Sequence, residues 1–234
     1  MIHNQEITEI AFILDRSGSM QSLGEAAIAG FNQFLRDQQE APDPARLTLV
    51  LFDDQYEVPV DNVPVSEILP LDTVTYVPRG STALLDAIGR TIESFHTRIA
   101  PLPKHDRPGQ VVFAIFTDGL ENSSQHFAWS DIARLIHDRR EADGWEFLFL
   151  GANQDAIATA SQLNIHAHDA ANVQCSPDGL DSSSRALSRK LQALRQAKRQ
   201  HGATYRQCAA KAPDDLGDLG KSMEQLLREE ERRE

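Results

Sequence analysis

Cysteine is scarce in this sequence, with only Cys175 and Cys208 among 234 residues. Two cysteines cannot build the disulfide framework of a small secreted domain, and they are too few for a cysteine-based zinc site. No uninterrupted apolar stretch is long enough to span a bilayer. Residues 1–6 have neither the basic region nor the apolar segment of a signal peptide. From these absences we expect a cytoplasmic protein with no membrane contact.

Basic residues are also in the minority. The chain has 23 Lys and Arg against 35 Asp and Glu, and its formal net charge is -12. Such an acidic balance argues against general nucleic-acid binding. One stretch departs from it, because residues 185–211 contain eight Lys or Arg and no Asp or Glu. This basic stretch is either the solvated face of an ordinary helix or a contact surface for an acidic partner or nucleic acid.

Apolar periodicity predicts alternating strands and helices. Runs typical of β-strands occupy residues 7–14, 46–54, 56–60, 110–117, 145–150 and 168–174. Helical spacing of apolar residues predicts helices near 22–40, 83–99, 130–141, 155–163 and 180–200. This alternation indicates an α/β fold with a doubly wound, mostly parallel six-stranded sheet and helices on both faces.

One strand is expected to run against the others. Asp53-Asp54-Gln55 is typical of a tight turn, so strand 56–60 should pair antiparallel with the strand before it. Pro59 and Pro64 place it at the sheet edge, where a missing N–H costs least. We expect the domain to span residues 1–200 and a helical tail to occupy 201–234. The tail's apolar stripe either docks on its own domain or serves as a partner or dimer helix.

Polar side chains cluster where predicted strands end and helices begin. Asp15, Ser17 and Ser19 follow the first strand, and Asp118 follows the most apolar one. Thr82 stands at the start of a helix. Carboxyl ends of parallel strands meet at one edge of a sheet, so these oxygens can converge on a hard cation, Mg²⁺, Mn²⁺ or Ca²⁺. The alternative is that the three hydroxyls merely cap helices.

The pattern Asp-x-Ser-x-Ser, then Thr, then Asp resembles the metal-ion-dependent adhesion site of von Willebrand factor A domains. Here the matching residues are Asp15, Ser17, Ser19, Thr82 and Asp118. The phrases Tyr-Val-Pro-Arg-Gly-Ser-Thr-Ala-Leu-Leu-Asp-Ala-Ile and Phe-Leu-Gly-Ala-Asn-Gln-Asp-Ala look like the bacterial and phage intracellular type of this family. The resemblance covers roughly residues 5–200 and implies the family's doubly wound fold.

The resemblance also implies a function. In such domains the two serines and the threonine contact Mg²⁺ directly or nearly so, and the aspartates hold it partly through water. One coordination position is left for an Asp or Glu of a protein partner. We therefore expect a metal-ion-dependent protein-binding module of a bacterial cytoplasm, which is not an enzyme and has no catalytic residues.

Two other functions are considered. A metal-dependent hydrolase or phosphatase-like enzyme could use His126 as a base and Asp53 or Asp54 as additional carboxylates. These residues are more simply explained as a loop histidine and hairpin-turn residues. An adaptor acting mainly through the basic stretch 185–211 is the second alternative.

Overall fold

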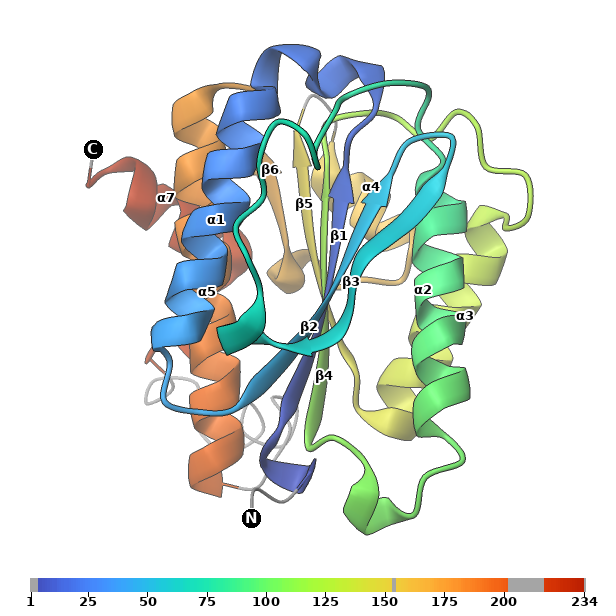
Figure 1. Ribbon diagram of the computed structural model, residues 1–234, viewed down its shortest axis with the longest axis vertical. Coiled ribbons are helices and arrows are strands. Elements are labelled where there is room, and N and C mark those ends of the chain that lie inside the picture. The colour runs from blue at the N-terminus through green and yellow to red at the C-terminus, as the bar shows by residue number, and fades with distance from the viewer. Residues whose placement is uncertain (1–3, 153–154, 202–216, 234) are drawn as a thin grey trace.

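The computed structural model describes residues 4–152, 155–201 and 217–233. Six strands form one sheet in the order β3-β2-β1-β4-β5-β6 (Figure 1). They are β1 (Thr8–Asp15), β2 (Ala45–Phe52), β3 (Tyr56–Pro64), β4 (Gln110–Thr117), β5 (Glu146–Ala152) and β6 (Ala170–Val173). Only the pairing of β3 with β2 is antiparallel. The predicted fold class, with β3 as an antiparallel edge strand, is confirmed.

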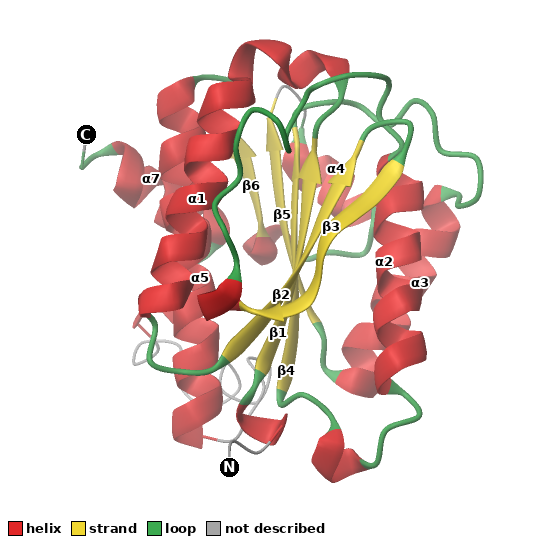
Figure 2. Cartoon of the chain, viewed as in Figure 1, coloured by secondary structure: helices red, strands yellow, loops and turns green. Residues whose placement is uncertain are grey.

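Helices cover both faces of this sheet (Figure 2). One face carries α1 (Gly24–Glu40), α5 (Pro177–His201) and α7 (Met223–Glu231). The other carries α2 (Leu84–Ile99), α3 (Trp129–Asp143) and α4 (Ala156–Gln162). Short 3₁₀ turns occupy Asn4–Glu6, Gly18–Leu23, Val65–Glu67, Lys104–Asp106, Ala167–Asp169 and Gly217–Gly220. No described helix combines the length and the apolar character required to cross a membrane.

Strand β4, at the centre of the sheet, is apolar from Val111 to Phe116 because both of its faces are buried. In β4, Val112 and Phe116 point to the α1/α5 side, whereas Phe113 and Ile115 point to the α2/α3 side. Phe113 stacks on Phe147 with ring centroids 4.8 Å apart. A nearly continuous apolar run of this kind is typical of a strand in a parallel sheet that helices cover on both faces.

The boundaries of several elements differ from the sequence prediction, and for two of them, β3 and the first helix, the structure shows the reason. Strand β3 continues to Pro64 rather than ending at residue 60, with register shifts and a left-handed Asn62 (φ 51°). Its outer face is polar, so apolar alternation does not mark its second half. The first helix begins at Gly24 rather than near 22, because a 3₁₀ turn over Gly18–Leu23 comes between β1 and the helix.

The described part of the tail docks on its own domain. Met223, Leu226 and Leu227 are buried in the core cluster of α1 and α5. Arg189 of α5 pairs at 2.7–2.8 Å with carboxylates of Asp218, Glu229 and Glu230. Residues 202–216, which include Cys208 and the end of the basic stretch, lie outside the described residues, so the boundary near residue 200 stays a prediction.

Candidate metal centre

Asp15 lies at the carboxyl end of β1, next to the end of β4. Its Oδ2 accepts a hydrogen bond from the hydroxyl of Thr117 at 2.5 Å, and its Oδ1 accepts one from the backbone N–H of Ser17 at 2.7 Å. The Tyr76 hydroxyl donates to its backbone carbonyl at 2.6 Å. The side chain is fully buried. Asp15 is therefore held from two loops and a neighbouring strand, and it has little freedom to reorient.

The two serines connect this aspartate to the loop after β4. The hydroxyls of Ser17 and Ser19 are hydrogen bonded at 3.0 Å, and Ser19 donates to Asp118 Oδ1 at 2.6 Å. Thr82 joins them from the start of α2. A Cβ placed on Gly119 would lie 2.7 Å from Thr82 Oγ1 and 3.4 Å from Ser19 Oγ. The structure thus brings all five predicted ligand residues together at one edge of the sheet.

Neither the serines nor the threonine serve as helix caps. Ser17 precedes the 3₁₀ turn, but its side chain makes no capping hydrogen bond. The N-cap of α2 is Ala83, one residue after Thr82. The capping alternative therefore does not account for these hydroxyls, and they remain available as oxygen ligands.

The second oxygen of Asp118 is the least satisfied atom of the cluster. Asp118 is 3% exposed, and its Oδ2 is buried without a hydrogen-bond partner among the described residues. Burial raises the pKa of Asp118. Burial also raises the pKa of Asp15 to about 6, against the hydrogen bonds from Thr117 and Ser17 that favour its ionised form. Both carboxylates lack the solvation that an ionised group needs, and a bound cation would supply it.

The donor set fits a hard divalent cation. It consists of two carboxylates and three hydroxyls, all oxygen, which suits Mg²⁺, Mn²⁺ or Ca²⁺ better than softer metals. Within the described residues, no three side chains of His, Cys, Asp or Glu gather into a metal-binding group elsewhere or here. Any cation at this centre would therefore depend on the hydroxyls.

Arg16, at a position to which the Asp-x-Ser-x-Ser pattern assigns no residue type, is buried and forms ion pairs. Its Nε lies 3.2 Å from Asp53 Oδ2, and its Nη2 lies 2.7 Å from Glu57 Oε1. Arg79 Nε also donates to Asp53 Oδ2 at 2.8 Å. Asp53 does accept from Gln55 N, as a turn residue would, but its charge is committed to the two arginines. This ion cluster joins the Asp15 loop to the turn between β2 and β3.

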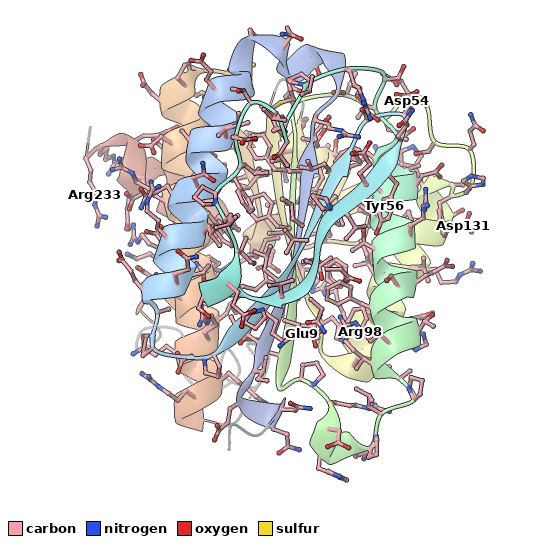
Figure 3. The ribbon with its side chains drawn as sticks, viewed as in Figure 1. Glu9, Asp54, Tyr56, Arg98, Asp131 and Arg233 are labelled. Carbon is pink, nitrogen blue, oxygen red and sulfur yellow. The ribbon has the colours of Figure 1, made fainter. Side chains whose placement is uncertain are left out.

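Backbone contacts complete the link between the first two loops. Gly18 N–H donates to the Gly80 carbonyl at 3.1 Å, and Arg79 N–H donates to the Arg16 carbonyl at 2.8 Å. Gly80 has φ 66°, and a Cβ there would collide with Asp54, which lies at the end of the β2–β3 turn (Figure 3). Only glycine suits this position.

The loop after Asp118 is held by the first turn of α2. Asn122 Oδ1 accepts from Thr82 N–H at 2.9 Å, and Asn122 N–H donates to the Thr82 carbonyl at 3.0 Å. The carboxylate of Asp86 accepts three backbone N–H groups, from residues 125–127, at 2.9–3.0 Å. His126 takes part through its backbone, and the residue is exposed. The sequence signal that could have identified the contact between α2 and the loop 125–127 is Asp86, an acidic residue in the first turn of a helix whose face is otherwise apolar.

Comparisons with known proteins agree on the fold. No family model matches the chain, and no curated protein matches it. Among solved structures it is similar to proximal thread matrix protein 1 of the mussel byssus, with 16% identity and a TM-score of 0.54 over 80% of this chain and 47% of that one. A von Willebrand factor type A protein from Catenulispora acidiphila gives 18% identity and a TM-score of 0.52 over 80% of this chain and 43% of that one.

A third similar structure is the manganese-loaded TRAP protein of Plasmodium vivax, with 13% identity and a TM-score of 0.52 over 74% of this chain and 70% of that one. The mussel protein is also known with zinc in its MIDAS motif, the metal-ion-dependent adhesion site. The present chain spans about half the length of the mussel and Catenulispora proteins, 47% and 43% respectively. These likenesses show that the chain has the von Willebrand factor A fold.

Proposed function

We propose that this chain is a metal-ion-dependent protein-binding module of a bacterial cytoplasm. It recognises an acidic side chain of its partner through Mg²⁺ held by Asp15, Ser17, Ser19, Thr82 and Asp118. The observation that carries the proposal is the Oδ2 atom of Asp118, which is buried and has no hydrogen-bond partner among the described residues. It lies next to three hydroxyl groups that do not cap helices. The fold adds support, because similar structures include ones loaded with manganese or zinc.

The residues of the site divide two tasks. Asp15 and Asp118 offset the charge of a divalent ion, while Ser17, Ser19 and Thr82 add neutral oxygens. With neutral hydroxyls as most of the ligands, the ion keeps an electrophilic position for one further carboxylate. Hydrogen bonds already orient Asp15 from Thr117 and from the backbone of Ser17. The chain therefore presents a preorganised half-site that a partner's carboxylate completes.

Apolar residues flank the site on the surface. Leu120, two residues after Asp118, is 65% exposed, and Val77, in the loop before Gly80, is 47% exposed. Large exposed apolar side chains are typical of protein interfaces, where the surrounding contacts exclude water from the central one. We infer that the partner surrounds its acidic residue with apolar side chains.

The two alternatives receive less support. For an enzyme, the exposed His126 would have to serve as the base, and the charge of Asp53 is already paired with Arg16 and Arg79. For an adaptor acting through the basic stretch, Arg189 is paired with three carboxylates. We therefore propose no catalytic residue.

The decisive experiment is calorimetric titration of Mg²⁺ and Mn²⁺ into chelator-treated protein. We expect single-site binding by the wild type and none by Ser17→Ala/Ser19→Ala. A matched control, Ser130→Ala/Ser161→Ala, removes two exposed hydroxyls outside the site and should bind as the wild type does. Unchanged metal affinity in the first variant would remove these serines from the site.

A second step tests the partner. Immobilised wild-type protein should retain a protein from a bacterial lysate in Mg²⁺ and release it on addition of chelator. The Ser17→Ala/Ser19→Ala protein should retain none of it. Retention that is insensitive to chelator would contradict recognition through the metal.

A further inference from the structure

A second polar cavity lies at the opposite end of the sheet from the candidate metal centre. It has a volume of about 700 Å³ and is bordered by the starts of β1 and β4 and by the last two turns of α5. These are the amino ends of the parallel strands, at the lower end of the molecule in Figure 1. The cavity therefore shares no residue with the metal centre.

Its described lining is strongly basic. Five cationic side chains face two carboxylates: Lys104, Arg107, Arg195, Lys198 and Arg199 against Glu6 and Asp43. One of those carboxylates, Asp43, is already paired with Arg199 at 3.2 Å. A surplus of positive charge in one concave place is notable on a chain of net charge -12. Like charges so gathered repel one another, so the arrangement costs free energy unless an anion compensates for it.

Arg195 is the most deeply placed of these cations, with 2% exposure. Its Nη1 donates to the side-chain oxygen of Gln38 at 2.7 Å, and its Nη2 donates to the backbone carbonyl of Asp43. Its Nε is buried and has no hydrogen-bond partner among the described residues. Neutral acceptors thus hold this guanidinium in place, and burial lowers the pKa of Arg195, against the opposing effect of the nearby Asp43 charge.

Arg107 is held in the same manner from the other side of the cavity. Its Nε and Nη2 donate to the backbone carbonyls of Leu102 and Ala100 at 2.9 and 2.6 Å. Nearby, a Cβ on Gly109 would lie 1.9 Å from the Gln5 carbonyl, so this position requires glycine, and Lys198 Cε lies 3.2 Å from where that Cβ would stand. The two guanidinium groups of Arg107 and Arg195 are therefore positioned by hydrogen bonds of the fold.

Two of the cations have no ion pair of their own. Within the described residues, neither Lys104 nor Lys198 forms a salt bridge or donates a side-chain hydrogen bond. Both lysines line the same cavity, and their ammonium groups are therefore available to an anion that enters it. Among the described residues these two ammonium groups have no ionic partner, and they line the same cavity as two guanidinium groups that neutral acceptors hold in position. Such cationic donors are suited to bind phosphate oxygens.

We infer that this cavity binds a small, multiply charged phosphate compound. Its volume lies within the range of small-molecule sites, about 300–1,000 Å³. Its described lining contains no aromatic side chain on which a base could stack, so the phosphates themselves must be the recognised groups. A long nucleic acid would also meet the acidic remainder of the surface, which favours a compact phosphate compound over a polymer.

The test uses the full-length protein and inorganic tripolyphosphate as the probe. Calorimetric titration is done at low salt with chelator present, so that phosphate cannot bind through a divalent ion at the other end of the sheet. We expect single-site binding by the wild type and also by Ser17→Ala/Ser19→Ala. The Lys104→Gln/Lys198→Gln variant removes two cations whose side chains make no hydrogen bond or salt bridge to the described part of the chain, so its fold should be retained.

We expect that variant to bind tripolyphosphate about tenfold or more weakly, since a charge-assisted hydrogen bond contributes at least that factor. The control Arg134→Gln/Arg228→Gln changes the net charge equally on exposed faces of α3 and α7 and should bind as the wild type does. Equal weakening in both variants would reduce the effect to general electrostatics and overturn the inference. Absence of binding by the wild type, or tighter binding of single-stranded RNA than of tripolyphosphate, would overturn it as well.

Discussion

Replacing Asp118 with Asn should separate stability from function. The wild-type carboxylate is buried. Its Oδ1 accepts a hydrogen bond from Ser19, whereas its Oδ2 has no hydrogen-bond partner among the described residues. An ionised carboxylate costs more free energy to bury than a neutral amide does. Asn has the same shape and can still accept from Ser19, but it carries no charge. In chelator, we therefore expect Asp118→Asn to raise the free energy of unfolding by about 1 kcal/mol.

When Mg²⁺ is added, we expect the wild type to become more stable to unfolding than Asp118→Asn. A ligand that binds only the folded state at 100 times its Kd stabilises by about 2.7 kcal/mol. For a chain of this size that corresponds to a rise in Tm of about 5–10 °C. The wild type should show this rise and Asp118→Asn should not, because the variant lacks one of the two charges that offset the ion.

The assay is thermal and urea unfolding of both proteins, with and without Mg²⁺. Asp138→Asn provides the control, since it removes one carboxylate from an exposed position of α3. It should respond to Mg²⁺ as the wild type does. Equal Mg²⁺ stabilisation of Asp118→Asn would show that Asp118 is no ligand. A loss of stability in chelator would show that the Ser19 hydrogen bond outweighs the burial of charge.

Three further substitutions test the framework around the site by urea unfolding. Arg16→Met should lower the free energy of unfolding by about 3 kcal/mol, because among the described residues it leaves the buried Asp53 with Arg79 as its only ionic partner. An unchanged free energy of unfolding would show that the Arg16–Asp53 ion pair does not stabilise the fold. Gly80→Ala should cost about 1–3 kcal/mol through its positive φ, and wild-type stability would contradict that strain. Leu226→Ala should cost about 2–5 kcal/mol, since the side chain is fully buried. A much smaller cost would indicate that α7 is dispensable.

The sequence predicted the strands at the centre of the fold closely. Strand β4 runs over Gln110–Thr117, as expected, because a strand buried on both faces must be apolar throughout. The positions of Asp15, the last residue of β1, and of Asp118, the first residue after β4, follow directly from where these strands end. Edge strand β3 was predicted too short, since half of its residues face solvent and follow no apolar pattern.

The supporting contacts of the site could not be read from the sequence. Arg16 occupies a position that the motif leaves open, and its partners Asp53 and Glu57 become neighbours only once β2 pairs with β3. The unpartnered oxygen of Asp118 depends on side-chain placement to within a hydrogen-bond length. Pattern reasoning gives the residue types of a site, whereas these properties arise from tertiary packing.

The alternation of β1 between two separate cores has a consequence for insertions and deletions. Ile10, Phe12 and Leu14 enter one core, while Ala11 and Ile13 enter the other. Losing one residue within this strand would exchange the two sets and move Asp15 out of register with β4. Leu69 and Val74, in the loop between β3 and α2, are exposed and enter neither core, although Leu71 and Tyr76 of the same loop are buried in the first one. Length variation among homologues should therefore be absent from β1 and β4 and be confined to exposed loop positions such as these two.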